Sequence, residues 1–376
     1  MICSSFGKCG GCSILDKSYD EQLLIKRELL LDYFREFEDK IHEIVPSPYQ
    51  YHYRNKMEFT FKKEKDDVLL GLHWKGKFWK IENIKDCLLV NPIVNEILSS
   101  VRDFAKRHNF EIYDSKKHKG NFRYLVVKES KKKEEFLLVF VTYREEFPFK
   151  DEIVNFLTER FKNIKSVYWG VNPEVSDVAL SKKLYHIYGE KNLVEEIGDK
   201  KFLISPYSFI QPNIYITERM YEFIKEVSGV KKDDVILDLY SGSGGISIIL
   251  ADFVKYFYGI EMDENSWRVS LENMKINGIK NGEFLLGDVR KVVPRLRRKS
   301  FDLVITDPPR SGMSKKSIRR VVELDFNKLI YIGCNLRSTV ENLREFLYNG
   351  FSVKGIYPFD MFPNTMHIEV VIHFER

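Results

Sequence analysis

From about residue 201 onward, short apolar segments alternate with helix-forming stretches, and this rhythm constrains the fold more than any other feature. Five such segments read as strands, followed by two more near the end (235–240, 256–261, 283–286, 302–306, 329–332, 351–357 and 367–374). Strand–helix–strand alternation predicts a parallel sheet covered by helices on both faces. The last two segments are too close for a crossover helix, so they are expected to pair antiparallel. We therefore predict an α/β fold with a seven-stranded, doubly wound sheet at residues 201–376.

The preceding residues have a different character. Residues 1–16 are rich in Gly and Cys, and Tyr19–Phe37 has apolar residues at helical spacing among charges, which predicts an amphipathic helix. Alternating runs between charged turns at residues 48–200 predict a mostly antiparallel sheet with one or two helices, one of them at Val90–His108. We therefore expect three parts: a cysteine loop with a helix at 1–47, an α+β domain at 48–200 and the α/β domain at 201–376.

The five cysteines divide into two sets. Cys3, Cys9, Cys12 and Cys87 form one set, and the first three of them make a C-x5-C-x2-C cluster. Cys334 stands alone after an apolar run. Closely spaced thiolates suit a soft metal centre. In a reducing compartment, cysteines favour metal binding or catalysis over disulfides. The sequence therefore indicates two sulfur chemistries, one that holds a metal centre and one that attacks a substrate.

Composition sets outer limits on function. No apolar run of 18 residues and no signal peptide is present, so we expect no membrane span and a cytoplasmic location. The net charge is a mild +5, but basic residues gather at 290–299 and 116–123, and they alternate with aromatic residues at 54–80. Basic side chains among aromatic rings suit the binding of a nucleic acid, because the charges contact phosphates and the rings stack on nucleobases. An ordinary solvated surface is the alternative.

A glycine-rich turn after the first predicted strand indicates a cofactor site. The segment Asp238–Gly245 reads DLYSGSGG and precedes an apolar helix, and its glycines allow a tight turn and a close approach to a ligand. Glu261 ends the second strand, 23 residues after Asp238, where a carboxylate accepts both ribose hydroxyls. Asp288 ends the third strand, where it can meet an adenine amino group. With seven strands, these features favour S-adenosylmethionine over NAD, although each acid can instead cap a helix or a turn.

Three reactive side chains follow later strands. Asp307 begins Asp-Pro-Pro-Arg after the fourth strand, Cys334 ends the fifth, and Glu369 lies in an otherwise apolar last strand. Carboxyl ends of parallel strands meet in one crevice, and an acid is costly to bury without a purpose. A thiolate and a carboxylate supply a nucleophile and a general base. Methylation of carbon 5 of a pyrimidine needs both, because a thiolate must add to carbon 6 and a base must later remove the carbon 5 proton, after the pyrimidine has left its stack.

Motifs along nearly the whole chain resemble the RNA 5-methyluridine methyltransferase family. They are YRNK at 53–56, GLHW at 71–74, SPYSFIQPN at 205–213, the glycine-rich turn, DPPR at 307–310, CN at 334–335 and PNTMHIE at 363–369. The resemblance implies a class I, Rossmann-like methyltransferase domain. It implies that Cys334 is the nucleophile and Glu369 the proton acceptor. It also implies that S-adenosylmethionine is bound by or lies beside six residues: Gln211, Tyr240, Gly245, Glu261, Asp288 and Asp307.

The same resemblance assigns Cys3, Cys9, Cys12 and Cys87 to a 4Fe-4S cluster, for which zinc is the physical alternative. Some family members carry an N-terminal RNA-binding β-barrel, the TRAM domain, for which the cysteine at residue 3 leaves no room. The chain therefore looks most like the short 23S ribosomal RNA uracil-5-methyltransferases, with RNA contacts on the 48–200 domain. We expect a monomer that acts on 23S rRNA; tRNA is the alternative substrate.

Two departures from the family pattern bear on these expectations. Gly245 stands where the family often has Asn, which removes a possible contact to the cofactor. Leu336 stands where Pro usually follows Cys-Asn, which changes the loop after Cys334. Competing hypotheses are a cytosine-5 RNA methyltransferase and a non-catalytic, cluster-bearing RNA-binding module. Nucleoside analysis of the product distinguishes cytosine methylation from uracil methylation. The presence of Asp307, Cys334 and Glu369 together argues against a non-catalytic module.

Overall fold

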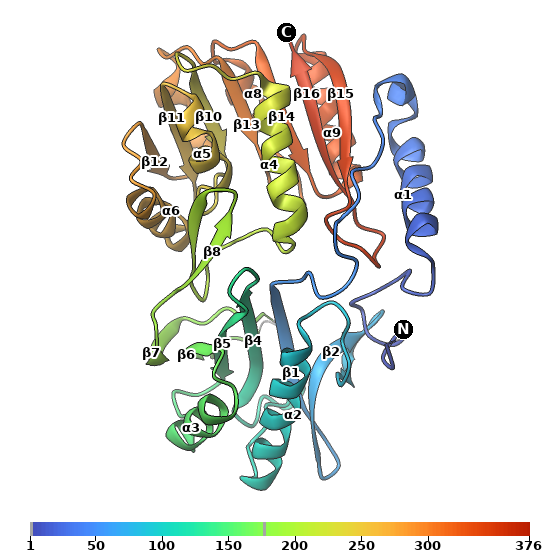
Figure 1. Cartoon of the computed structure of the whole chain (residues 1–376), viewed down its shortest axis with the longest axis vertical. Coiled ribbons are helices and arrows are strands. Elements are labelled where there is room, and N and C mark those ends of the chain that lie inside the picture. The colour runs from blue at the N-terminus through green and yellow to red at the C-terminus, as the bar shows by residue number, and fades with distance from the viewer. Residues whose placement is uncertain (1–2, 176–177) are drawn as a thin grey trace. The chain divides into compact units, whose positions relative to one another are not determined.

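The computed structural model describes residues 3–175 and 178–376. The chain forms two compact units, which are described one at a time. The first unit contains Met1–Asp16, Tyr49–Glu195 and Ile204–Tyr207. The second unit contains Lys17–Pro48, Glu196–Leu203 and Ser208–Arg376. Figure 1 shows the elements of both along the colour-ramped chain.

The first unit is built on a seven-stranded sheet with the order β3-β2-β1-β4-β5-β6-β7. Its strands are β1 (Lys56–Glu64), β2 (Asp67–Trp74), β3 (Lys77–Asn83), β4 (Phe122–Ser130), β5 (Glu135–Thr142), β6 (Ile164–Val171) and β7 (Lys183–Gly189). Neighbours are antiparallel except β5 and β6, which are parallel because helix α3 (Lys150–Arg160) connects them. With α2 (Pro92–Arg107), this agrees with the predicted, mostly antiparallel sheet and its one or two helices. The short strands β8 (Leu193–Ile197) and β9 (Lys200–Ile204) form a separate two-stranded sheet.

The second unit contains the predicted seven-stranded sheet, in the order β12-β11-β10-β13-β14-β16-β15. Its strands are β10 (Val235–Leu239), β11 (Tyr256–Glu261), β12 (Gly282–Leu286), β13 (Leu303–Thr306), β14 (Lys328–Gly333), β15 (Ser352–Phe359) and β16 (Glu369–Glu375). The first five are parallel, and β16 runs antiparallel between β14 and β15. The predicted antiparallel pairing of the last two strands is therefore confirmed.

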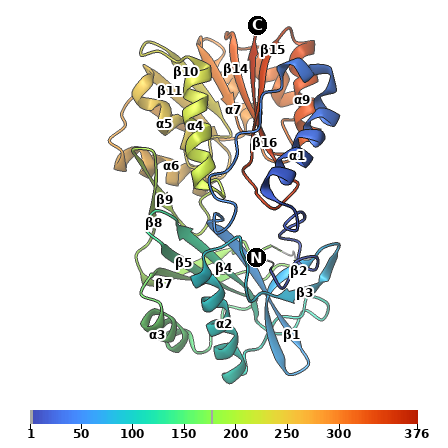
Figure 2. The same ribbon diagram turned by 45° about the vertical axis from the view of Figure 1, so that its right-hand side comes forward.

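Helices cover both faces of this second sheet. They are α1 (Tyr19–Phe34), α4 (Ile214–Ser228), α5 (Gly245–Leu250), α6 (Glu264–Ile276), α7 (Val289–Val292), α8 (Lys315–Val322) and α9 (Leu336–Tyr348), with 3-10 turns at Arg35–Lys40, Ala251–Phe253 and Val293–Leu296. Successive strand residues point to opposite faces. Ile236 and Ile305 accordingly join the core under α4 and α5, whereas Leu237 and Val304 join the core under α1, α8 and α9. In Figure 2, α1 lies beside α9, with which it is in contact.

The N-terminal segment does not stay together as predicted. The cysteine loop belongs to the first unit, whereas α1 belongs to the second, and the expected boundary near residue 200 falls inside the β8–β9 hairpin. The helix starts where predicted, since Ser18 and Glu21 form a capping box, and its α-helical part ends at Phe34 before a 3-10 turn. Leu30 and Phe34 are buried in the core of the second unit, and that burial ties the helix to the sheet rather than to the cysteine loop.

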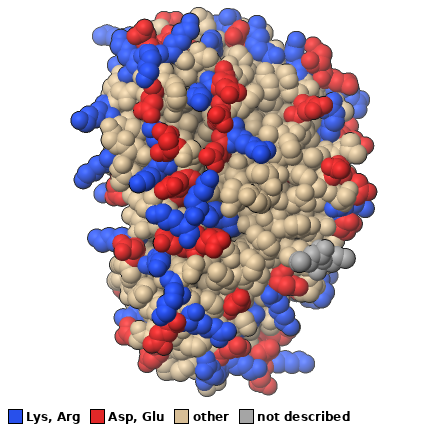
Figure 3. Space-filling model, in the orientation of Figure 1, with Lys and Arg blue, Asp and Glu red and all other residues tan. Residues whose placement is uncertain are grey.

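Across the part of the chain that the structure describes, we find no helix with the length and apolar content that crossing a bilayer requires. On the face seen in Figure 3, Lys and Arg side chains are interspersed with Asp and Glu. This mixture accords with the mild net charge of +5.

Candidate active site and cysteine loop

The reactive residues of the second unit gather at one edge of its sheet. Strands β10 to β14 are parallel, so the residues that follow them emerge at the same edge. Strand β16 runs the other way and begins at this edge with Glu369. Gly333 pairs with Val370, so Cys334 and Glu369 each lie one residue further toward the same edge of adjacent strands. Asp307 follows β13, the other neighbour of β14.

Burial alters the acidity of both carboxyl groups. Glu369 is 2% exposed, and burial raises its pKa to about 7, while the charge of Arg310 acts in the opposite direction. Asp307 keeps some accessible surface but is densely surrounded, and desolvation followed by the charge of Glu369 raises its pKa well above the usual range. The Gln211 Nε2 group donates a hydrogen bond of 3.0 Å to Asp307 Oδ2. The predicted residues Gln211, Asp307 and Glu369 thus come together.

Cys334 is partly exposed, as an attacking group must be, but its thiol is not activated in the free protein. Desolvation, followed by the charges of Glu369 and Asp307, raises the pKa of Cys334 to about 12. Arg310 opposes this shift. Cys334 also directly precedes Asn335, the N-cap of α9, whose Oδ1 accepts from Arg337 N at 3.1 Å. A helix N-terminus favours a nearby thiolate.

The glycine-rich turn adopts a strained backbone next to these groups. Gly242 and Gly244 have φ angles of 56° and 86°, which glycine adopts readily. Tyr240 has a φ of 61°, which a tyrosine rarely adopts. Strain of this kind is maintained by its surroundings and is frequent at functional sites. A Cβ on Gly244 would lie 2.5 Å from Phe284 Cζ, so glycine is required there. Two buried atoms beside the turn, Asp238 Oδ1 and Ser241 Oγ, lack a hydrogen-bond partner among the described residues.

The two acids predicted to contact a nucleoside lie at the ends of β11 and β12 but differ in their bonding. Glu261 Oε2 accepts from Gly242 N at 2.8 Å, which ties the glycine-rich turn to the neighbouring strand. Asp288 caps α7 and accepts from Arg290 N at 2.8 Å, and it also pairs with the Arg290 guanidinium. The helix-cap alternative for Asp288 is therefore realised. Exposed apolar side chains flank both acids, with Met262 at 69% and Leu286 at 43% exposure.

Tyr221 and Arg310 are two residues of this site that the sequence interpretation did not assign. A Cβ on Gly245 would lie 2.6 Å from the Tyr221 hydroxyl oxygen, so Tyr221 fills the space that a side chain at 245 would need. Burial, followed by the charges of Asp307, Asp238 and Glu369, raises the pKa of Tyr221 well above its usual range. Tyr221 comes from the middle of α4 and carries no sequence signal. Arg310 was visible as the last residue of the DPPR motif. His367, which belongs to the PNTMHIE motif, is exposed.

In the first unit, the four predicted sulfur ligands lie near enough for the charge of one thiol to shift the pKa of another. Cys9 pairs with Trp74 in an isolated bridge, and Gly10 N donates to His73 O at 3.0 Å, so β2 holds the loop. The charges of Cys3, Cys9 and Cys87 each raise the pKa of the Cys12 thiol, to about 12 with burial as the main cause. Backbone N–H groups face the sulfurs of Cys3, Cys9 and Cys87. Within residues 3–175 and 178–376, no three His, Cys, Asp or Glu side chains are arranged to hold one metal ion.

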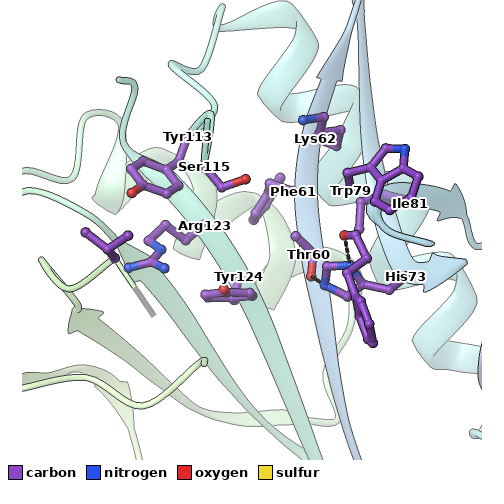
Figure 4. A pocket seen from close by; sticks show the side chains of 12 residues that line it. Thr60, Phe61, Lys62, His73, Trp79, Ile81, Tyr113, Ser115, Arg123 and Tyr124 are labelled. Atoms are coloured by element: carbon purple, nitrogen blue, oxygen red, sulfur yellow. Dashed lines mark hydrogen bonds between the residues drawn. The ribbon is translucent and has the colours of Figure 1, made fainter. Parts of the chain in front are cut away.

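An open, aromatic pocket lies elsewhere on the first unit (Figure 4). Arg123 stacks over Tyr113 at 4.7 Å and Tyr124 at 5.3 Å on one side of it. The β2–β3 hairpin contributes Phe78 and Trp79 to the lining, and these are 75% and 58% exposed. The remaining lining residues are Thr60, Phe61, Lys62, His73, Ile81, Ser115 and Val175. Cations and exposed rings are thus combined in the segment where the sequence indicated nucleic-acid contact.

Comparison with known proteins identifies the family. The family model for tRNA (uracil-5-)-methyltransferase matches residues 18–376. An uncharacterized RNA methyltransferase of Caldanaerobacter subterraneus is 38% identical, over 100% of this chain and 84% of its own length. Another, of Nanoarchaeum equitans, is 34% identical over 100% of this chain and 80% of its own length.

A solved structure agrees with this assignment. It is the Pyrococcus abyssi tRNA (uracil-54, C5)-methyltransferase in complex with S-adenosyl-L-homocysteine. It matches with a TM-score of 0.79 and 28% identity, over 97% of this chain and 86% of its own. Together with the site at the sheet edge, these matches show that the chain belongs to the tRNA (uracil-5-)-methyltransferase family of S-adenosylmethionine-dependent RNA methyltransferases.

Proposed function

We propose that the protein methylates carbon 5 of a specific uridine in RNA, with Cys334 as the nucleophile and Glu369 as the proton acceptor. The observation that carries this proposal is the position of these two residues. Cys334 directly follows β14 and Glu369 begins the adjacent strand β16, at the sheet edge where Asp307 also lies. A partly exposed thiol beside a buried carboxyl group is the pair that a carbon 5 methylation requires.

The residues divide the reaction into steps. The Cys334 thiolate forms a bond to carbon 6, and the electron pair of the 5,6 double bond makes carbon 5 nucleophilic. After carbon 5 is methylated, Glu369 takes its remaining proton. The released pair re-forms the double bond while the sulfur–carbon bond breaks. A Glu369 pKa near 7 suits this task, because a base of that strength is ionised yet able to hold a proton at neutral pH.

The cofactor, when bound, supplies an electrophilic methyl group, and the residues around the glycine-rich turn fit it. Asp238 Oδ1 and Ser241 Oγ, which have no hydrogen-bond partner in the described part of the chain, provide polar atoms for a ligand, and the tight turn at Gly242 and Gly244 provides space. Glu261 would hold the ribose, and Met262 and Leu286 would cover the base. Gln211, Tyr240, Gly245, Asp288 and Asp307 would line the same site.

The pocket of the first unit would bind the RNA around the target. Exposed Phe78 and Trp79 offer faces on which unpaired bases stack. Lys80 lies 4.6 Å above the Trp74 ring, and Lys62 lines the pocket, so positive charge accompanies the rings. This combination supports contact with single-stranded RNA, which presents bases and phosphates together.

Two RNA targets are supported by different observations. Four cysteines at the positions of the family's cluster ligands support 23S rRNA. The Pyrococcus abyssi enzyme, whose name gives tRNA as its substrate, supports tRNA. Nucleoside mass spectrometry with site mapping on both RNAs, from cells with and without the gene, separates the two by which RNA loses 5-methyluridine. Loss of 5-methylcytidine instead would overturn the choice of uracil.

Two variants test the chemical roles. Cys334→Ala is expected to abolish both turnover and any covalent RNA adduct. Glu369→Gln is expected to let a methylated, covalently linked RNA accumulate, because the thiolate cannot leave until the carbon 5 proton is removed. The adduct is read by denaturing gel with RNA methylated from radiolabelled cofactor. Rapid turnover by Glu369→Gln would remove that residue from the proposed role.

We further propose that Cys3, Cys9, Cys12 and Cys87 hold a 4Fe-4S cluster. Each of the four irons in such a cluster takes one thiolate, so the ligands surround it rather than meet at a single ion. Four mutually repelling thiolates also need a cationic centre to be ionised together. The backbone N–H groups directed at the sulfurs suit cluster thiolates, which accept such bonds.

A further inference from the structure

The segment that leads into Glu369 is a loop between two neighbouring strands. Strand β15 ends at Phe359 and β16 begins at Glu369, and these two residues are paired across the sheet. Residues 360–368 therefore leave and re-enter the sheet at the edge where Cys334 lies. Glu369 is the first residue of β16, so the loop joins directly to the residue that carries the carboxyl group.

Helix α1 faces this loop with a stripe of buried residues that changes character along the helix. Gln22, Lys26, Leu30 and Phe34 recur every four residues and are at most 2% exposed. Leu30 and Phe34 pack into the core of the second unit. Gln22 and Lys26 occupy the same stripe but are polar, so apolar packing does not explain them.

Lys26 binds the start of the loop in a fully buried ion pair. Its Nζ lies 2.5 Å from Asp360 Oδ1, and both side chains are 0% exposed. The same Nζ donates to Phe362 O at 3.0 Å. The second Asp360 oxygen accepts from the Tyr19 hydroxyl at 2.9 Å, so two residues of α1 hold one carboxylate.

Gln22 binds the middle of the loop through both ends of its amide. Its Nε2 donates to Asn364 Oδ1 at 3.1 Å, and its Oε1 accepts from Asn364 N at 2.7 Å. Asn364 is fully buried and has a φ of 67°, so this reciprocal pair holds a residue in the left-handed region. From the other side, Asn213 Nδ2 donates to Met361 O at 3.3 Å.

The energetics favour a positioning role over simple stability. A buried ion pair gains little over well-packed apolar residues of similar volume, because both charges lose their hydration. Leu30 and Phe34 already anchor the helix by apolar burial. Gln22 and Lys26, the polar half of the stripe, fix the position of the loop, because hydrogen bonds and ion pairs depend on distance and angle in a way that apolar contacts do not.

We propose that Gln22 and Lys26 of α1 act as positioning residues, which hold the 360–368 loop and thereby place Glu369 for removal of the carbon 5 proton. The proposal rests on the proton-acceptor role given to Glu369 above. It assigns to an N-terminal helix, remote in sequence from every reacting group, a function in the last chemical step. Binding of the cofactor and formation of the thiolate adduct use other residues and need not change.

The test measures which step slows. Lys26→Met and Gln22→Ala are each expected to slow breakdown of the methylated RNA adduct roughly 10- to 100-fold, as misplacement of a catalytic group does. The KM for the cofactor and the rate of adduct formation are expected to stay within about twofold. Adduct is followed by rapid quench and denaturing gel. Gln22→Ala leaves the ion pair in place, so it supplies a folded variant if Lys26→Met is unstable.

Leu30→Ala is the matched control, because it weakens the same helix and removes none of the hydrogen bonds or the ion pair that hold the loop. It is expected to lower the unfolding temperature while adduct breakdown stays at the wild-type rate. If Glu369→Gln traps the adduct but neither Lys26→Met nor Gln22→Ala slows its breakdown, the positioning role is wrong and the proposed function stands. If Glu369→Gln traps no adduct, the proposed function itself fails. If Leu30→Ala slows adduct breakdown equally, the slowing reflects loss of stability and the positioning role is wrong.

Discussion

Arg310 lowers the pKa of both Cys334 and Glu369, although its own side chain is exposed. It is thus a cation that favours the ionised forms of the nucleophile and of the base. Its removal raises both pKa values, so the thiolate fraction of Cys334 falls at any given pH below its pKa. We expect Arg310→Met to move the pH profile of Cys334 alkylation by iodoacetamide upward by about half a unit, the size of an exposed charge interaction.

The control for this experiment is Arg319→Met, which removes another exposed arginine, on α8, whose charge is not among those that shift the pKa of Cys334. It is expected to leave the alkylation profile unchanged. A downward shift for Arg310→Met, or an equal shift in both variants, would contradict the role given to Arg310.

At Gly245, the effect of a substitution on stability depends on one neighbour, Tyr221. Since a Cβ there would meet the Tyr221 hydroxyl at 2.6 Å, Gly245→Asn is expected to lower the free energy of unfolding by about 1–3 kcal/mol. Adding Tyr221→Phe should recover part of that loss, because the atom in closest conflict is removed. Urea denaturation measures both. Gly278→Asn is the control, since Gly278 faces open space and Asn tolerates its φ of 67°; no recovery in the double variant would refute the conflict.

The β2–β3 hairpin is the element on which the proposed RNA contact depends. Stacking of a base on an aromatic ring contributes about 1–3 kcal/mol. The double variant Phe78→Ala and Trp79→Ala is therefore expected to raise the KM for RNA by roughly 10- to 100-fold, with kcat and the cofactor KM little changed. Tyr348→Ala, which removes a 90% exposed ring from α9, serves as the control. An unchanged RNA KM in the hairpin variant would place RNA binding elsewhere.

Elements with strong periodicity were predictable, and those shaped by packing were not. All seven strands of the second sheet lie within a few residues of their predicted ranges, because apolar runs bounded by polar turns identify buried strands. The helix predicted at 19–37 forms at Tyr19–Phe34, with a 3-10 turn after it. The segment that this helix contacts could not be predicted. In the sequence, Lys26 looks like a lysine on a solvated helix face, and only the structure shows that Asp360 pairs with it.

For the molecule as a whole, the cysteine loop leads to a prediction about metal content. Protein purified without oxygen is expected to contain about four iron atoms per chain with matching sulfide. Cys12→Ser is expected to lose the iron and to unfold more readily, because metal binding contributes to folding. Elemental analysis and thermal melts provide the measurements. Cys334→Ser is the control and should retain iron, whereas about one zinc atom per chain in the wild type would favour the alternative metal.

The sequence alone was enough to predict the succession of strands and helices at residues 201–376 and the glycine-rich turn that follows the first of these strands. These features are local, since periodicity and turn chemistry are properties of short segments. The roles given to the four cysteines and to Asp307, Cys334 and Glu369 stay predictions. The tertiary structure decided which distant segments meet: Tyr221 with Gly245, Arg310 with both reacting groups, and α1 with the loop before Glu369. Those contacts arise from burial and pairing between residues up to 342 positions apart, which no local pattern records.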